Sequence, residues 1–204
     1  MNNIRATLLV MTLVFVLIEP SRAQEQNCKE IGAAAQMARA KSTRALNDAR
    51  KQAGESYLAR LVFAYRFFHL HPKSKAAAES LLSLIPADNT QQKIVLTLGD
   101  SLCDEESVAD IKVLARVNEG LAQGLAAAVL LSPRFLSSYV SYSTTATEDP
   151  HSDYAVHMKK VCREAHGAFT DAVKQLSQDQ QTLFAKHVLN PSSCAVLAVP
   201  ESDR

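Results

Sequence analysis

The stretch that decides the fold is ESYLARLVFAYRFFHL, residues 55–70. Its apolar side chains fall on every face of a helix, and five aromatic residues lie between Tyr57 and Phe68. A helix that is apolar all round is typical of a buried helix. The stretch therefore predicts a helix at the centre of the core, with Phe63 and Phe67 both buried. An exposed aromatic stripe that binds a partner is the alternative interpretation.

The segments on both sides of this stretch also favour helices. Residues 29–52 are rich in Ala, Arg and Lys, which have high helix propensity. Extended alternating runs and Asn-Gly or Asp-Gly hairpin turns are absent from the sequence, so strand signals are weak. Caps, Gly and Pro divide the rest into expected helices over 75–85, 91–98, 101–118, 120–131, a segment starting at 133, 154–176 and 179–189.

These segments predict an all-α fold, either a single irregular multi-helix bundle or a helix-pair stack. Their lengths vary and follow no fixed period, so a named repeat array is not supported. Gly120 and Gly124 form a G-x-x-x-G pattern, which in this context predicts tight helix packing rather than a membrane dimer. We expect residues 195–199 to form a lone strand or irregular coil.

The N-terminus has the organisation of a secretory signal peptide. One Arg at position 5 precedes an apolar run over residues 6–18, and Ser21-Arg22-Ala23 places small residues at a cleavage site. A helix over residues 6–18 rises only about 20 Å, which is shorter than a hydrocarbon core of about 30 Å. We expect a signal peptide over 1–23, a mature secreted domain over 24–204 and no membrane span after cleavage. The expected location is secreted or periplasmic.

Composition and motifs narrow the classes of function. Lys and Arg total 22 against 21 Asp and Glu, so the chain lacks the basic field that drives nucleic-acid binding. The G-x-S-x-G, H-E-x-x-H, Gly-rich phosphate-loop and G-x-G-x-x-G motifs are absent from the sequence. The serines at 137, 138, 141 and 143 have no neighbouring base in sequence. These absences favour a non-enzymatic protein without a cofactor, although catalytic groups can also assemble from distant residues.

An even number of cysteines in an exported chain predicts disulfides. A short joint at Ser177-Gln178 suggests that the helices on either side form an antiparallel hairpin. Cys162 and Cys194 lie at similar distances from that joint, so the sequence predicts a Cys162–Cys194 disulfide. Elimination leaves Cys28–Cys103 as the second pair.

Two groups of polar side chains contain residues that can bind a metal ion. Cys162-x-x-x-His166 places a thiol and an imidazole one helical turn apart, but no second pair supplies further zinc ligands at helical spacing. The denser cluster contains acidic and imidazole groups that can bind a divalent metal or act as an acid/base pair. Its members are Asp149, His151, Asp153 and His157. The structural alternative is an ordinary helix start, with Asp149 as the N-cap and Pro150 in the first turn.

The sequence therefore supports two hypotheses for function. The first is an exported, non-enzymatic helical domain that binds a protein or a cell-envelope component. The alternative is a small secreted enzyme or metal-binding protein that uses the cluster over residues 149–157.

Overall fold

The computed structural model describes residues 28–96, 108–147, 152–187, 189–190 and 194–196. The fold is all-α, as the sequence predicts. A first helix covers residues 28–39. It is followed by α2 (Thr43–Gln52), α3 (Tyr57–Leu70), α4 (Lys75–Leu82), α5 (Asn89–Leu96), α6 (Val108–Leu131), the 3₁₀ turn η2 (Pro133–Phe135), α7 (Leu136–Ala146), α8 (Asp153–Glu164), α9 (His166–Lys174), α10 (Gln178–His187), β1 (Leu189–Asn190) and β2 (Ala195–Val196).

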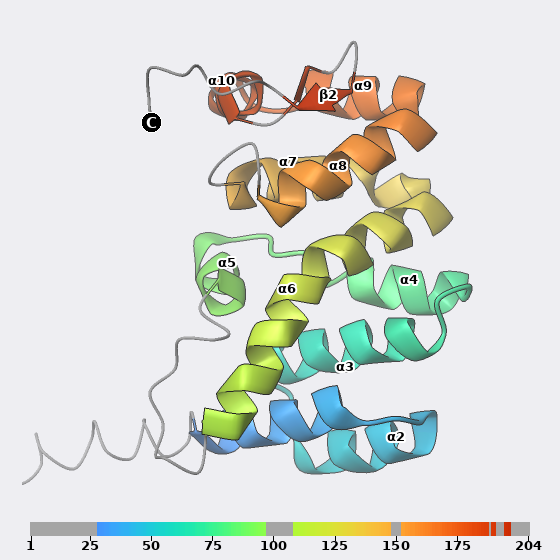
Figure 1. Ribbon diagram of the computed structural model, residues 1–204, viewed down its shortest axis with the longest axis vertical. Helices are drawn as coiled ribbons and strands as arrows, with labels where there is room; N and C mark the ends of the chain where they lie inside the picture. The colour runs from blue at the N-terminus through green and yellow to red at the C-terminus, as the bar shows by residue number, and fades with distance from the viewer. Residues whose placement is uncertain (1–27, 97–107, 148–151, 188, 191–193, 197–204) are drawn as a thin grey trace, which may run out of the picture.

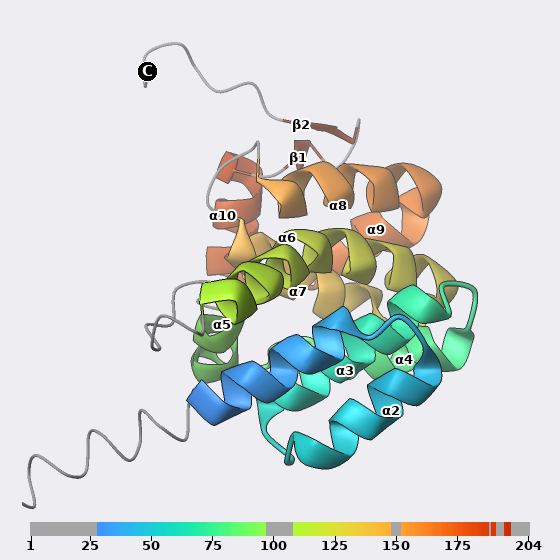
Figure 2. The same ribbon diagram turned by 60° about the horizontal axis from the view of Figure 1, so that its bottom comes forward.

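The helices are stacked in layers along the long axis of the molecule (Figure 1). Helices that follow one another in sequence pack together: α2 against α3, α3 against α4, α7 against α8, and α8 against α9. The long helix α6 crosses the stack diagonally and contacts α3, α4 and α8. A second view shows α6 between the N-terminal helices and α7–α10 (Figure 2). The arrangement is an irregular helix-pair stack.

The buried apolar residues form two clusters. The N-terminal cluster is mostly small and aliphatic, and contains Ile31, Ala34, Ala35, Met37, Ala40, Leu46, Ala53, Leu58, Ala59, Val62, Leu114 and Val117. The C-terminal cluster is larger and includes the buried aromatic residues Phe68, Tyr139, Tyr142, Tyr154, Phe169 and Phe184. Both α3 and α6 contribute to both clusters, so the two cores form one continuous interior. The prediction that the helix within 55–70 lies at the centre of the core is confirmed.

The prediction that Phe63 and Phe67 are both buried was wrong. Both side chains are partly exposed, and their rings stack on each other with centroids 5.9 Å apart. The guanidinium of Arg50 lies 6.0 Å from the centroid of Phe63, and the ring of His71 packs on Phe67 at 4.8 Å. The reason is the helical periodicity: residues four apart share one face of α3, and that face is only partly covered by α2.

Side-chain caps fix where the helices begin. Ser42, Ser56, Ser74 and Ser152 each accept a hydrogen bond on Oγ from the backbone N–H three residues later, at 3.2–3.4 Å. Asp88 does the same with Oδ1 at 2.8 Å. Such caps satisfy backbone donors that have no partner inside the helix. Ser74 caps the helix that the sequence places from residue 75, and Asp88 caps a helix that begins two residues before the expected start at 91.

The expected helices differ from the structure most at three places. The stretch 29–52 is divided into two helices, because the chain leaves the first helix after residue 39 and Ser42 starts α2. The expected helix over 154–176 is broken at Ala165, whose backbone (φ −130°, ψ 40°) ends α8 and begins α9. In the opposite sense, the expected break near Asn118 was wrong, since α6 continues through it to Leu131.

Gly120 and Gly124 pack against the ring of Tyr65 from α3. A Cβ on Gly124 would lie 3.2–3.3 Å from two Tyr65 ring carbons, and a Cβ on Gly120 would overlap the Tyr65 hydroxyl. The two glycines therefore form a notch for one aromatic ring, which confirms the prediction of tight packing. Among the described helices, none is both long enough and apolar enough to cross a membrane.

The chain segment after α10 contains a short ribbon. Strands β1 and β2 are antiparallel, with Leu189 opposite Val196 and Asn190 opposite Ala195. The expectation of a lone strand or coil was therefore wrong at Ala195–Val196, while residues 197–199 lie outside the described part of the chain. The ribbon matters because it holds the residue just before β2, Cys194, against α8.

Candidate functional site

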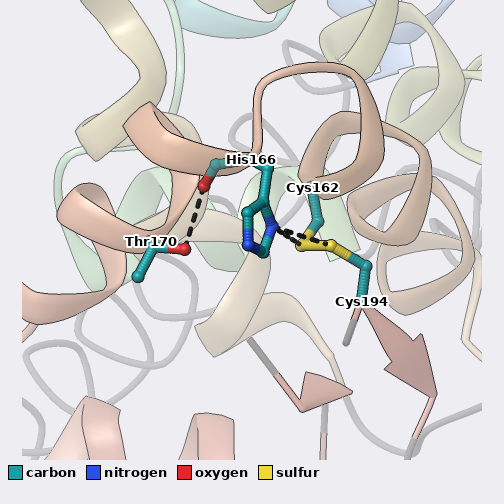
Figure 3. Close-up of a disulfide and its surroundings, with 4 residues drawn as sticks. All are labelled: Cys162, His166, Thr170 and Cys194. Carbon is teal, nitrogen blue, oxygen red and sulfur yellow. Dashed lines mark hydrogen bonds between the residues drawn. A yellow bond between two sulfur atoms is a disulfide. The ribbon is translucent and has the colours of Figure 1, made fainter. Parts of the chain in front are cut away.

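Cys162 and Cys194 form a disulfide that joins α8 to the start of β2 (Figure 3). Their Cα atoms are 5.7 Å apart, and both residues are buried. The predicted pairing is confirmed, although Cys162 belongs to α8 and not to a helix that continues to Ser177. Cys28 lies in the first helix, but Cys103 lies outside the described residues, so the Cys28–Cys103 pair stays a prediction.

The imidazole of His166 lies directly against this disulfide. Its Nδ1 is 3.4 Å from the Sγ of Cys194 and 3.9 Å from the Sγ of Cys162. Figure 3 shows the ring beside both sulfurs. His166 is the first residue of α9 and is exposed, and its carbonyl oxygen accepts a 2.9 Å hydrogen bond from the hydroxyl of Thr170. The three potential ligand atoms lie within 4.8 Å of one another. The site therefore combines two buried sulfurs with one accessible nitrogen.

The sequence contained only part of this arrangement. The spacing of Cys162 and His166 indicated a thiol–imidazole pair, and the missing element was a third ligand. Cys194 supplies it from 28 residues beyond His166, and it does so because the ribbon returns the chain to α8. Local spacing carries no signal for that return.

The backbone of Cys194 has an unusual conformation. Its φ is 50°, and it is the one positive-φ residue other than glycine in the described chain. The left-handed region costs a residue with a Cβ on the order of 1–2 kcal/mol, because Cβ approaches the following carbonyl oxygen. Such strain persists only where the surrounding structure holds it. Here the disulfide and the ribbon hold Cys194 in that conformation.

The predicted cluster around the start of α8 is only partly described. Asp149 and His151 lie outside the described residues. Asp153 is the exposed first residue of α8, and His157 lies one turn further on and is half-buried. Burial lowers the pKa of His157 below its ordinary value; Lys160 acts in the same direction and Asp153 opposes it. The metal site at Asp149, His151, Asp153 and His157 stays a prediction.

The helix start itself differs from the structural alternative. Ser152, not Asp149, accepts the capping hydrogen bond of α8, from the backbone N–H of Ala155. Asp153 then occupies the first turn, where the helix dipole favours a negative charge.

A groove lined by several polar side chains lies beside α7. One cavity of about 330 Å³ lies between α7, the loop over residues 85–88 and α10. A second cavity of about 280 Å³ lies between α7, α9 and α10. The two share Ser138, Ser141 and Gln180, and we call them together the α7 groove. The lining of the α7 groove also includes Asp88, Ser137, Tyr142 and Thr145.

Hydrogen bonds set the shape of the α7 groove. Gln180 donates from Nε2 to the Oγ of Ser141 at 2.7 Å, and this bond spans α10 and α7 between the two cavities. Ser137 donates to the Oε1 of Gln175 at 2.8 Å across the second cavity. Asp88 is the one charged side chain among the described residues that line the groove. The lining is therefore rich in neutral donors and acceptors.

Buried tyrosines form a rigid floor beneath the groove. Tyr142 lines the first cavity and packs edge-to-face on Tyr154, with ring centroids 5.5 Å apart and hydroxyl oxygens 3.1 Å apart. Burial raises the pKa of Tyr154 to about 12 and raises the pKa of Tyr142 further. Both phenols therefore stay protonated and act as neutral hydrogen-bonding groups at physiological pH.

The serine-rich stretch is visible in the sequence, but its hydrogen-bond partners are not. Ser137 and Ser141 have glutamines beside them, Gln175 and Gln180, and not a catalytic base. A run of serines along one helix face, with a glutamine on a later helix, is the signal that points to a groove. Comparison with protein-family models, curated proteins and solved structures finds no match to this chain.

Proposed function

We propose that the mature chain is an exported, non-enzymatic helical domain that binds a protein partner through the α7 groove. The observation that carries the proposal is the pair of cavities whose linings share Ser138, Ser141 and Gln180, a polar channel crossed by the Gln180–Ser141 hydrogen bond. Their sizes fall near the range of ligand-binding pockets, about 300–1,000 Å³. The helices that line the channel are fixed on the C-terminal cluster, so the site is preorganised.

The chemistry of the lining favours an extended peptide segment. A peptide backbone presents alternating N–H and C=O groups, which need both donors and acceptors. Hydroxyl groups supply both: Ser138 is exposed in the lining, and Thr145, which donates to the Ser141 carbonyl oxygen, can still accept a hydrogen bond. Asp88 is among the residues that line the first cavity, and a basic residue of the partner would pair with its carboxylate. A glycan of the cell envelope is the rival ligand and an outcome of the test.

A phage-displayed peptide library tests this proposal directly. Wild-type protein should enrich a family of peptides, most of them with one basic residue. Ser138→Arg and Thr145→Arg change exposed groove residues, so they fill the channel without altering the core, and they should reduce binding of those peptides by roughly tenfold or more. Thr182→Arg, an exposed change on α10 outside the groove lining, is the matched control and should bind normally.

Two results would contradict the proposal. The first is peptide binding that all three arginine variants retain equally, which would place the site elsewhere. The second is no peptide enrichment together with groove-dependent binding of an envelope polysaccharide, which would identify the rival ligand.

Export is the second part of the proposal, and it has its own measurement. The expected mature N-terminus is Gln24, because the signal-peptide pattern ends at Ala23. Intact mass of the protein secreted by its own host should therefore correspond to residues 24–204. Retention of residues 1–23 would contradict it.

A further inference from the structure

We propose that Cys162, Cys194 and His166 form a Zn²⁺ site when their disulfide is reduced. The same three side chains would then exist in two states, a covalent cross-link and a metal centre. This site is separate from the α7 groove, and neither proposal depends on the other.

The geometry around His166 is the first support. In a tetrahedral zinc site with Zn–S of about 2.3 Å and Zn–N of about 2.0–2.1 Å, a ligand nitrogen lies about 3.6 Å from each sulfur. The Nδ1 of His166 lies 3.4 Å and 3.9 Å from the two sulfurs, close to that value on both sides. The nitrogen is therefore already at the third vertex, and the two sulfurs need only separate from each other.

The burial pattern is the second support. Both cysteines are buried while His166 is exposed, so a metal ion bound by all three has one open side toward solvent. Three protein ligands with an open fourth position are typical of zinc sites that bind water or a substrate group. Two thiolates and one imidazole are also the ligand set that favours Zn²⁺ over the harder Mg²⁺ and Ca²⁺.

The strained backbone of Cys194 is the third support. A residue with φ of 50° is held where an ordinary side chain is disfavoured, and the effect is to aim its sulfur at α8 beside His166. The ribbon of β1 and β2 contributes to this placement through backbone pairing. We expect this pairing to persist when the disulfide is reduced and to leave the two sulfurs near the imidazole.

The disulfide is converted to the Zn²⁺ site in two steps, reduction and metal binding. An external dithiol gives two electrons and two protons to the Cys162–Cys194 bond, which breaks into two thiols, and the dithiol is oxidised to its own disulfide. Zn²⁺ then displaces the two thiol protons and bonds to both thiolates and to the neutral imidazole of His166. Exchange with an external disulfide, which takes up the two electrons and two protons and becomes a dithiol, releases Zn²⁺ and restores the cross-link.

The test uses the full mature chain, reduced with a phosphine and titrated anaerobically with Co²⁺ and then with Zn²⁺. Reduced wild type should bind one Co²⁺ with thiolate charge-transfer bands and tetrahedral ligand-field bands, and Zn²⁺ should displace it. The oxidised protein should show neither band. His166→Ala should weaken Zn²⁺ binding by roughly tenfold or more, because loss of a direct ligand costs at least as much as loss of a supporting one.

Controls separate this site from the rest of the chain. His69→Ala changes an exposed histidine on α3 and should leave the affinity unchanged. A Cys28→Ser and Cys103→Ser background retains Cys162 and Cys194 as its only thiols, and it should keep the Co²⁺ spectrum.

The proposal fails if reduced, folded wild type takes up no Co²⁺, or if His166→Ala binds Zn²⁺ as tightly as wild type. If reduction lowers the helix content measured by circular dichroism, Zn²⁺ should restore it in wild type and restore less in His166→Ala. Equal recovery in both, or no recovery, would also overturn the proposal.

Discussion

The N-terminal and C-terminal clusters are built from different residues. The N-terminal cluster contains residues that only pack, whereas both candidate sites adjoin the C-terminal cluster. Alanines and aliphatic side chains fill the N-terminal cluster, so its helices pack closely and bury few polar atoms. The C-terminal cluster contains large aromatic residues, and tyrosine, serine and cysteine side chains reach from it to the groove and to His166. Both candidate sites therefore lie on the aromatic half of the molecule.

Helix α6 joins the two halves. Leu114 and Val117 on its first turns belong to the N-terminal cluster, whereas Leu121, Leu125 and Val129 belong to the C-terminal cluster. Because one helix contributes to both clusters, the loss of one core also removes packing partners of the other. We therefore expect a single cooperative unfolding transition for the described domain.

The largest expected effect compares the same substitution in the two halves. Phe169 is fully buried against Phe184, so Phe169→Ala should lower the free energy of unfolding by about 3–5 kcal/mol. Phe63→Ala removes a ring that is only partly buried, and its expected loss is about 1–2 kcal/mol. Urea denaturation followed by circular dichroism measures both. Equal losses would contradict the difference between the two halves. Two separate transitions would contradict a single continuous interior.

The next effect concerns the cross-link of the C-terminal half. A Cys162→Ala and Cys194→Ala double variant should lose about 3–4 kcal/mol, since the disulfide closes a loop with a sequence separation of 32 residues. Amide hydrogen exchange should speed up most in α8 and least in α2, because α2 packs in the N-terminal half. A similar increase in both helices would show that the disulfide acts on the whole chain instead.

The sequence was sufficient for the fold class, for reasons that are local. The Cys162–Cys194 pair was also predicted correctly, but from an unbroken helix up to Ser177 that the structure does not contain. Helix caps such as Ser74 and Asp88 act within four residues, so they can be read directly from the chain. The break at Ala165 could not be read, because alanine has the highest helix propensity. That break follows from tertiary packing, which turns α9 toward α7.

The candidate sites depend on long-range contacts, and that limited what the sequence revealed. Cys162 and His166 are four residues apart and were recognised as a pair, whereas Cys194 joins them only through the ribbon. Gln180 reaches Ser141 across 39 residues. Phe63 and Phe67 were expected to be buried because a helix that is apolar all round gives no hint of which face its neighbours leave open.

A smaller effect tests how the two halves meet at Gly120. Gly120→Ala should cost about 1–3 kcal/mol, since the new methyl group overlaps the Tyr65 hydroxyl and the Tyr65 ring must move. Tyr65→Phe in the same chain removes that hydroxyl and should recover most of the loss. Gly167→Ala is the control: nothing lies within 4 Å of its added Cβ, so it should be neutral or slightly stabilising. Thermal unfolding of the four variants completes the double-mutant cycle, and failure of Tyr65→Phe to rescue would contradict the notch.

The smallest effect is the pH dependence contributed by His157 on α8. Burial lowers the pKa of this imidazole in the folded protein, so the unfolded chain binds a proton more readily than the folded one. The stabilising contribution is therefore complete above the ordinary histidine pKa of 6.5 and is lost as the pH falls below it.

His157→Gln should flatten this acid-side decrease in the free energy of unfolding, and His69→Gln controls for the removal of a histidine. The measurement is urea denaturation of the oxidised protein in EDTA between neutral and mildly acidic pH. If added Zn²⁺ instead stabilises the oxidised wild type and not His157→Gln, the result would support the alternative site at Asp149, His151, Asp153 and His157, because Cys162 and Cys194 are not available as ligands in the disulfide.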